Sequence, residues 1–339
     1  LAVKVGRAAA EVLGGEHRPL VLIGKDTRIS SDMLECALIA GLTAAGADVL
    51  RLGVVPTPAV AYLSVLHNAD AGIVISASHN PFEHNGIKIF NGSGYKLSDE
   101  LEAAIEEHVL SDEEPKNTSF DKLGRIICVQ TEPVEEYIEH LAMAAEGGNH
   151  NVRILVDCAN GAASAVAPKL FKRLNMNADF INCEPDGVNI NNECGSTHMD
   201  QLKEKVVSGG YDLGIAFDGD ADRCLAVDEK GNEVDGDKIM AACAQYERER
   251  GMLNQNAIVA TVMSNMGMHV YCRENGLKLV CTDVGDRHVL EKMLECGYCI
   301  GGEQSGHIIF TRFATTGDGE LAALRLLKAL DEKKCTLSE

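Results

Sequence analysis

One stretch gives the clearest indication of the fold: Gly72-Ile73-Val74-Ile75-Ser76-Ala77-Ser78-His79-Asn80-Pro81. An apolar run followed by small and polar residues is typical of a buried strand whose carboxyl end reaches a binding site. Asn80-Pro81 favours a turn, because proline disfavours helix at the residue before it. With Lys88 close behind, the loop offers a hydroxyl, an imidazole and an amine. Ser78 is therefore a candidate to carry a covalent group, although such a loop taken alone is more often a plain polar turn.

A second loop, Asp218-Gly219-Asp220-Ala221-Asp222-Arg223, lies between two apolar runs at 213–217 and 224–227. Three carboxylates at alternate positions repel one another unless a cation lies among them. Carboxylate oxygens favour magnesium or calcium over zinc or copper. A calcium loop of the EF-hand type is excluded, because Arg223 stands where that loop requires glycine and because the flanking runs predict strands.

A third loop, Gly301-Gly302-Glu303-Gln304-Ser305-Gly306-His307, also lies between two apolar runs. Glycine allows a ligand to approach the backbone closely, and Glu303, Ser305 and His307 offer acceptors and donors for hydroxyl or amino groups. On its own this glycine-rich loop is a weak indication of a sugar site.

Together the three loops resemble those of the alpha-D-phosphohexomutase family, in which they are the phosphoserine, magnesium-binding and sugar-binding loops. Some details resemble the bacterial branch that acts on glucosamine phosphates more than the branch that acts on glucose and mannose phosphates, which is the alternative. These details are Gln304, Val284-Gly285-Asp286-Arg287, Gly195-Ser196-Thr197-His198 and Ala314-Thr315-Thr316-Gly317-Asp318-Gly319. The resemblance extends from Gly24 to Asp318 and so covers nearly the whole chain.

The resemblance implies an isomerase that interconverts glucosamine 6-phosphate and glucosamine 1-phosphate, in the synthesis of amino-sugar nucleotides and cell-wall precursors. The phosphosugar substrate would pass through a sugar 1,6-bisphosphate, which would also serve as activator. Ser78 would carry the phosphoryl group and would bind Mg²⁺ together with the carboxylates of Asp218, Asp220 and Asp222. Lys88 would be the acid/base, with His79 and Arg223 assisting. The residues expected to contact the substrate are Glu303, Ser305, Arg287 and Arg28.

Helical stretches such as 32–45 alternate with short apolar runs such as 152–156. This alternation predicts an α/β fold, organised as three consecutive domains with mixed, mostly parallel sheets around a central cleft. We expect the domains to span residues 1–133, 134–236 and 237–339, which carry the phosphoserine, magnesium and sugar loops in that order. The family's N-terminal segment and its fourth, phosphate-binding domain have no counterpart in the sequence, and we expect a helix over 321–327.

The 339 residues include 31 basic and 51 acidic side chains, for a net charge of −20. Nucleic acid is therefore excluded as a partner, since a phosphate backbone requires a basic footprint. No apolar run approaches the roughly 20 residues that span a bilayer. Twelve cysteines without a secretory leader predict reduced thiols in the cytoplasm. A homodimer is one assembly compatible with the sequence.

Two other classes of function remain as rivals. A phosphatase would use Asp218 as its nucleophile and would have no need of Ser78. A sugar-phosphate sensor would keep Glu303 and Ser305 but would not need the serine or the three aspartates. A stable phosphoserine on the isolated protein would distinguish the mutase from the phosphatase.

Overall fold

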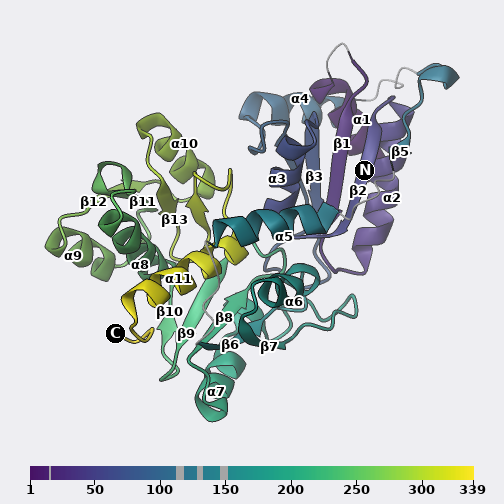
Figure 1. Ribbon diagram of the computed structural model, residues 1–339. Coiled ribbons are helices and arrows are strands. Elements are labelled where there is room, and N and C mark those ends of the chain that lie inside the picture. The colour runs from purple at the N-terminus through teal and green to yellow at the C-terminus, as the bar shows by residue number, and fades with distance from the viewer. Residues whose placement is uncertain (15–16, 112–117, 128–132, 146–151) are drawn as a thin grey trace.

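The computed structural model describes residues 1–14, 17–111, 118–127, 133–145 and 152–339. These residues form three sheets, each with its own helices, which follow one another along the chain (Figure 1). The first group of elements is α1 (Ala2–Leu13), β1 (Leu20–Lys25), α2 (Ser30–Ala44), β2 (Asp48–Val54), α3 (Thr57–Leu66), β3 (Ala71–Ile75), β4 (Ile87–Asn91), α4 (Asp99–Leu110), η1 (Phe120–Lys122) and β5 (Ile126–Ile127).

The second group of elements is α5 (Pro133–Ala144), β6 (Arg153–Asp157), α6 (Ala163–Arg173), β7 (Asn177–Ile181), η2 (Gly195–Thr197), α7 (Asp200–Gly209), β8 (Leu213–Phe217), β9 (Cys224–Asp228) and β10 (Glu233–Val234). The third group is α8 (Gly236–Glu249), η3 (Asn254–Asn256), β11 (Ala257–Thr261), α9 (Met266–Glu274), β12 (Lys278–Thr282), α10 (Asp286–Cys296), β13 (Ile300–Gly302), β14 (Ile308–Phe310) and α11 (Gly319–Lys333).

The three sheets share one topological feature. Their strand orders are β4-β3-β1-β2-β5, β10-β9-β8-β6-β7 and β12-β11-β13-β14. In each sheet a strand that is parallel to one neighbour (β3, β8 or β13) pairs on its other side with the antiparallel strand that follows it in sequence (β4, β9 or β14). The loop that joins the two strands is, in turn, the first, second and third loop identified in the sequence.

The predicted α/β class with three mixed, mostly parallel sheets is confirmed. Strands β3, β8, β9 and β11 are buried along their whole length, as expected where helices cover both faces of a sheet. The helix expected over 32–45 is α2, the strand expected over 152–156 is β6, and the helix expected over 321–327 lies within α11. The domain boundaries stay predictions, and the first of them adjoins residues 128–132, which lie outside the described part.

Helices α5 and α11 lie between the sheets (Figure 1). α11 contacts α5, α8, β8, β9 and β14. The Tyr137 hydroxyl on α5 donates to the N-cap Asp318 of α11 at 2.8 Å, and the buried Arg325 donates to the Ala144 carbonyl at 3.0 Å. These contacts hold the second and third groups of elements together.

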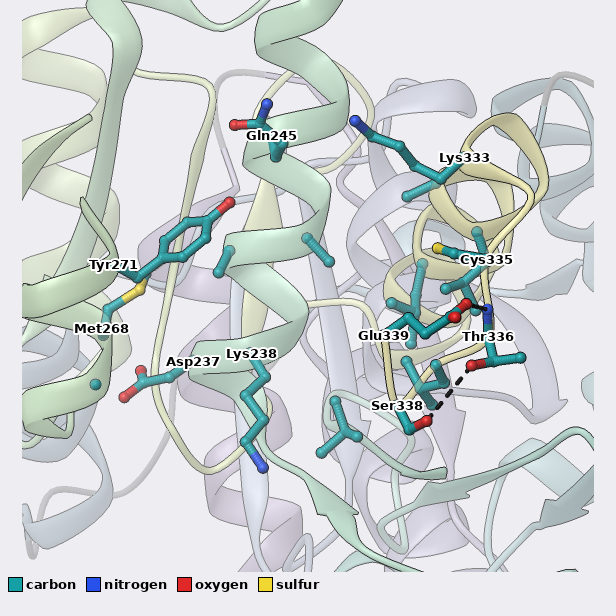
Figure 2. A pocket seen from close by; sticks show the side chains of 18 of the residues that line it. Asp237, Lys238, Gln245, Met268, Tyr271, Lys333, Cys335, Thr336, Ser338 and Glu339 are labelled. Atoms are coloured by element: carbon teal, nitrogen blue, oxygen red, sulfur yellow. Dashed lines mark hydrogen bonds between the residues drawn. The ribbon is translucent and has the colours of Figure 1, made fainter. Parts of the chain in front are cut away.

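A pocket of about 500 Å³ lies between α8, α9, α11 and the segment 335–339. Figure 2 shows Tyr271 and Met268 on one side of this pocket and Lys333, Cys335, Thr336, Ser338 and Glu339 on the other. The described residues that line it include none of the predicted site residues. Within the described ranges, no helix is both long and apolar enough to cross a membrane.

Candidate active site

The first loop holds Ser78 in an unusual backbone conformation. Its φ is 50°, in the left-handed region, which costs a residue with a side chain about 1–2 kcal/mol. The Ser78 N–H donates to the Ser76 hydroxyl at 3.0 Å. The Ser78 carbonyl accepts from the Arg28 guanidinium at 3.1 Å and from the Asn191 amide at 2.9 Å. The surrounding residues thus hold the loop in a strained arrangement that presents the Ser78 hydroxyl to the second loop.

The Ser78 hydroxyl donates to Asp218 Oδ2 at 2.5 Å, across a sequence separation of 140 residues. The second loop can approach so closely because it has glycine at 219, where a Cβ would lie 2.5 Å from the Ser78 carbonyl oxygen. A candidate nucleophile from the first sheet therefore meets a carboxylate from the second.

The carboxylates of Asp218, Asp220 and Asp222 are buried, and one oxygen of each lies within 4.8 Å of the others. Asp220 Oδ1 and Asp222 Oδ1 are buried and accept no hydrogen bond from any residue that the structure describes. Burying an oxygen that accepts no hydrogen bond costs free energy unless a cation binds to it. The donor set is all oxygen, as Mg²⁺ prefers, so these residues fit a magnesium ion.

Charges in and around this cluster explain its pKa shifts. Burial, together with Asp222 and Asp220, raises the pKa of Asp218 well above its usual range. Burial would also raise the pKa of Asp222, but Lys88 and His307 lower it below its ordinary value. Burial alone would lower the pKa of Lys88, yet the carboxylates of Asp220 and Asp222 raise it. Lys88 is therefore held as an ammonium group in this arrangement.

Lys88 lies on β4, directly opposite Val74 of β3, and its Nζ is 2.5 Å from Asp220 Oδ2 and 3.6 Å from Asp222 Oδ2. The backbone N–H of Arg223 donates to Asp218 Oδ1 at 3.2 Å. The buried Arg223 Nε makes no hydrogen bond among the described residues and lies 3.9 Å from Asp222 Oδ1. His79 is exposed beside Ser78.

The third loop is joined to the second through backbone and side-chain contacts. The Cys224 N–H donates to the Gly306 carbonyl at 3.0 Å. The buried His307 has Nδ1 3.6 Å from Asp222 Oδ2 and Nε2 3.4 Å from Asp286 Oδ2. In the same loop, Glu303 Oε1 accepts from the Gly285 N–H at 3.3 Å, while Ser305 is exposed. The three loops therefore converge at the three buried carboxylates.

Two predicted substrate contacts have protein partners in this structure. The buried guanidinium of Arg28 pairs with Asp26 and holds loop carbonyls, so it supports the Ser78 loop from beneath. Arg287 pairs with Asp99 of the first group and with Glu291 of its own helix. A neighbouring pair, Lys96 and Asp286, joins the same two groups.

Several residues that shape the site gave no signal in the sequence. Thr57, Asn191 and Asp286 are ordinary polar residues in their local context, and each contacts the site from a distant part of the chain. Asp286 lies in the segment 284–287, whose resemblance to the family does not indicate the contact with His307. Neighbouring residues in the sequence do not indicate such contacts, because the contacts depend on how the three sheets pack against one another.

Comparison with known proteins agrees with this geometry. Family models for phosphoglucomutase/phosphomannomutase alpha/beta/alpha domains I, II and III match residues 1–116, 135–231 and 235–339. The chain belongs to the phosphohexomutase family. Its relatives include the phosphoglucosamine mutases of Caldicellulosiruptor bescii, 55% identical over 344 residues, and of Acetivibrio thermocellus, 52% identical over 342 residues. Each alignment covers 100% of this chain and 76% of the relative.

Solved phosphohexomutase structures have the same fold. A phosphoglucomutase/phosphomannomutase family protein from Burkholderia thailandensis aligns with a TM-score of 0.81 and 27% identity, over 98% of this chain and 72% of that one. A putative phosphomannomutase from Thermus thermophilus aligns with a TM-score of 0.85 and 23% identity, over 99% and 77% of the two chains. At 23% identity the second comparison supports the fold alone.

Proposed function

We propose that this chain carries the phosphoglucosamine mutase reaction, the interconversion of glucosamine 6-phosphate and glucosamine 1-phosphate. The observation that carries the proposal is the 2.5 Å hydrogen bond from the Ser78 hydroxyl to Asp218, beside three buried carboxylates. The curated relatives at 52–55% identity are named for this activity. In a phosphatase with Asp218 as its nucleophile, a serine held in a strained conformation and hydrogen-bonded to that aspartate would have no function.

The proposed metal ligands are Asp218, Asp220, Asp222 and an oxygen of the phosphoryl group on Ser78. Mg²⁺ would offset the negative charge of the transferring phosphoryl group. An N-acetylphosphoglucosamine mutase of Aspergillus fumigatus has been solved with GlcNAc-6P and magnesium. In this chain, the orphaned oxygens of Asp220 and Asp222 support the same assignment.

The remaining residues supply proton transfer and orientation. Lys88, kept protonated by Asp220 and Asp222, would give a proton to the serine oxygen or the sugar oxygen as the phosphoryl group moves between them. Arg223 would offer its buried Nε N–H to the transferring group. The exposed His79 and the buried Arg28 are assigned to shaping the loop around Ser78.

The sugar is assigned to the third loop. Glu303 and Ser305 would contact the hydroxyl or ammonium groups and not the phosphate, because a carboxylate repels phosphate and attracts an ammonium group. Arg287 would take part after leaving Asp99, with which it pairs here. A sugar 1,6-bisphosphate would form when Ser78 donates its phosphoryl group, and would return the other phosphate to Ser78 after turning around in the site.

The test is a mutase assay on the full-length protein that contains this chain, with glucosamine 6-phosphate, glucose 6-phosphate and mannose 6-phosphate as separate substrates. We expect glucosamine 1-phosphate as the preferred product, and no turnover by Ser78→Ala. Turnover by Ser78→Ala within a few fold of the wild type would refute the role of Ser78. A preference for glucose or mannose phosphate would assign the chain to the other branch of the family.

Domain boundaries and location complete the proposal. We retain domains over 1–133, 134–236 and 237–339, each built on one of the three sheets. The cysteines among the described residues are free thiols, which supports a cytoplasmic location. The partner is a phosphosugar, and the proposal involves neither nucleic acid nor membrane.

A further inference from the structure

Thr57 connects the first group of elements to the metal-binding loop of the second. It is the first residue of α3, after Pro56, and it is buried. Its hydroxyl donates to Asp220 Oδ2 at 2.5 Å, and its backbone N–H donates to the Asp220 carbonyl at 3.0 Å. One residue therefore holds both the side chain and the main chain of a carboxylate that lies 163 positions away in the sequence.

The two oxygens of Asp220 are used unequally. Oδ2 accepts from the Thr57 hydroxyl and from Lys88 Nζ, each at 2.5 Å. Oδ1 is buried and accepts from no described residue, and Asp220 is one of the three carboxylates that fit a metal. A carboxylate with one oxygen held by two donors has a fixed rotation about its Cβ–Cγ bond, so that its other oxygen has a fixed direction.

We propose that Thr57 is a positioning residue for the metal: its hydroxyl orients Asp220 so that Oδ1 is directed at the cation. This inference rests on the proposed function of the site, in that it takes the three carboxylates to be metal ligands. Groups that orient metal ligands typically change metal affinity or activity about 10- to 100-fold when removed. Lys88 also donates to Asp220 Oδ2, whereas Thr57 donates both to Oδ2 and, through its backbone N–H, to the Asp220 carbonyl.

A simpler role for Thr57 would be to join the first two groups of elements. A second threonine, Thr27, allows this joining role to be distinguished from the orientation of Asp220. The Thr27 hydroxyl donates to the Asn160 carbonyl at 2.6 Å, so it also links the first group to the second. It does not contact a carboxylate of the cluster in the described structure. Thr27→Val therefore removes a comparable link without affecting the orientation of Asp220.

The experiment measures binding of Mn²⁺ alone to the full-length protein, by electron paramagnetic resonance, for the wild type, Thr57→Val, Thr57→Ser and Thr27→Val. Valine keeps the shape of threonine and removes the hydroxyl, whereas serine keeps the hydroxyl. We expect Thr57→Val to weaken Mn²⁺ binding by about 10-fold or more, and we expect Thr57→Ser and Thr27→Val to stay within about twofold of the wild type. Turnover of Thr57→Val should recover towards the wild-type value as the metal concentration is raised.

Each contrary outcome has a distinct meaning. Mn²⁺ binding by Thr57→Val within twofold of the wild type would overturn the inference, as would equal losses in Thr57→Val and Thr57→Ser, or in Thr57→Val and Thr27→Val. If Thr57→Val does not fold, as judged by circular dichroism, Thr57→Ala takes its place with the same criteria. Failure of the wild type itself to bind Mn²⁺ would instead refute the proposed metal site.

Discussion

Replacing Asp218 with asparagine should have opposite effects on stability with and without metal. Asp218 lies among three buried carboxylates. Lys88 contacts the other two, Asp220 and Asp222, but not Asp218. Asparagine has nearly the same shape and can still hydrogen-bond to the Ser78 hydroxyl and the Arg223 N–H. The substitution therefore removes the free-energy cost of burying an acid here, either as a repelled carboxylate or as one that must hold a proton because its pKa is raised, and it leaves the packing of the loop in place.

The magnitude follows from the geometry. Carboxylate oxygens at most 4.8 Å apart repel by at least about 3.5 kcal/mol for each ionised pair at an effective dielectric constant of about 20. Asp218 takes part in two such pairs, and the nearby Arg223 offsets part of the repulsion. We therefore expect Asp218→Asn to stabilise the metal-free protein by about 1–3 kcal/mol, which is a rise of roughly 2–10 °C in the unfolding midpoint.

The assay is thermal unfolding of the full-length protein in EDTA and in excess Mg²⁺, for the wild type and two variants. The wild type should gain stability with Mg²⁺, because a ligand that binds only the folded state stabilises it, and Asp218→Asn should lose most of that gain. Asp157→Asn is the matched control. Asp157 is also buried, but it accepts from the N–H groups of Ala159 and Gly195 and from the Asn182 amide.

In Asp157→Asn the side-chain NH₂ group faces N–H donors and cannot accept from them. This substitution should therefore destabilise the protein by about 1–3 kcal/mol with or without metal. The same chemical change should thus have opposite signs at positions 157 and 218 in EDTA. If Asp218→Asn lowers the midpoint in EDTA and retains the full gain with Mg²⁺, the carboxylates are not a repelling cluster completed by a cation, and the reasoning fails.

Two further predictions concern the sugar loop and pH. Glu303→Gln should raise KM for glucosamine 6-phosphate more than it slows phosphorylation of Ser78 by a sugar bisphosphate; equal losses in both kinetic assays would remove Glu303 from sugar recognition. Burial raises the pKa of Asp318 to about 6 from its ordinary 3.8. The proton bound to Asp318 therefore stabilises the folded protein below about pH 4, and this stabilisation is lost as pH rises through about 6. The free energy of unfolding should fall by about 3 kcal/mol over this range. Asp318→Asn should remove this decline, so that its unfolding midpoint relative to the wild type rises between about pH 4 and pH 7; a pH-independent difference in midpoint would contradict the pKa shift.

The main features of the fold could be predicted from the sequence because the informative signals are local. The apolar runs that end at Ile75, Phe217 and Val227 alternate with helical segments, and such runs form buried strands wherever helices cover both faces of a sheet. The placement of Ser78 and the aspartates at strand ends follows from the same pattern. These features depend only on neighbours in sequence.

The contacts that shape the candidate site could not be predicted in this way. Thr57 follows Pro56 and resembles any helix start, and only the packing of the first sheet against the second brings its hydroxyl to Asp220. A cation in a loop gives no indication of burial, and in the structure the Arg28 guanidinium is buried and pairs with Asp26; its contact with the substrate stays a prediction. Such contacts are determined by the tertiary arrangement.

The central claim is that Ser78 carries the phosphoryl group, and the direct test is intact-mass measurement with phosphopeptide mapping after incubation with glucosamine 1,6-bisphosphate and Mg²⁺. The account predicts a gain of one phosphoryl group on the wild type, mapped to Ser78 and stable on the isolated protein, and no gain on Ser78→Ala. A phosphoryl group mapped to Asp218, or an equal gain on Ser78→Ala, would contradict it.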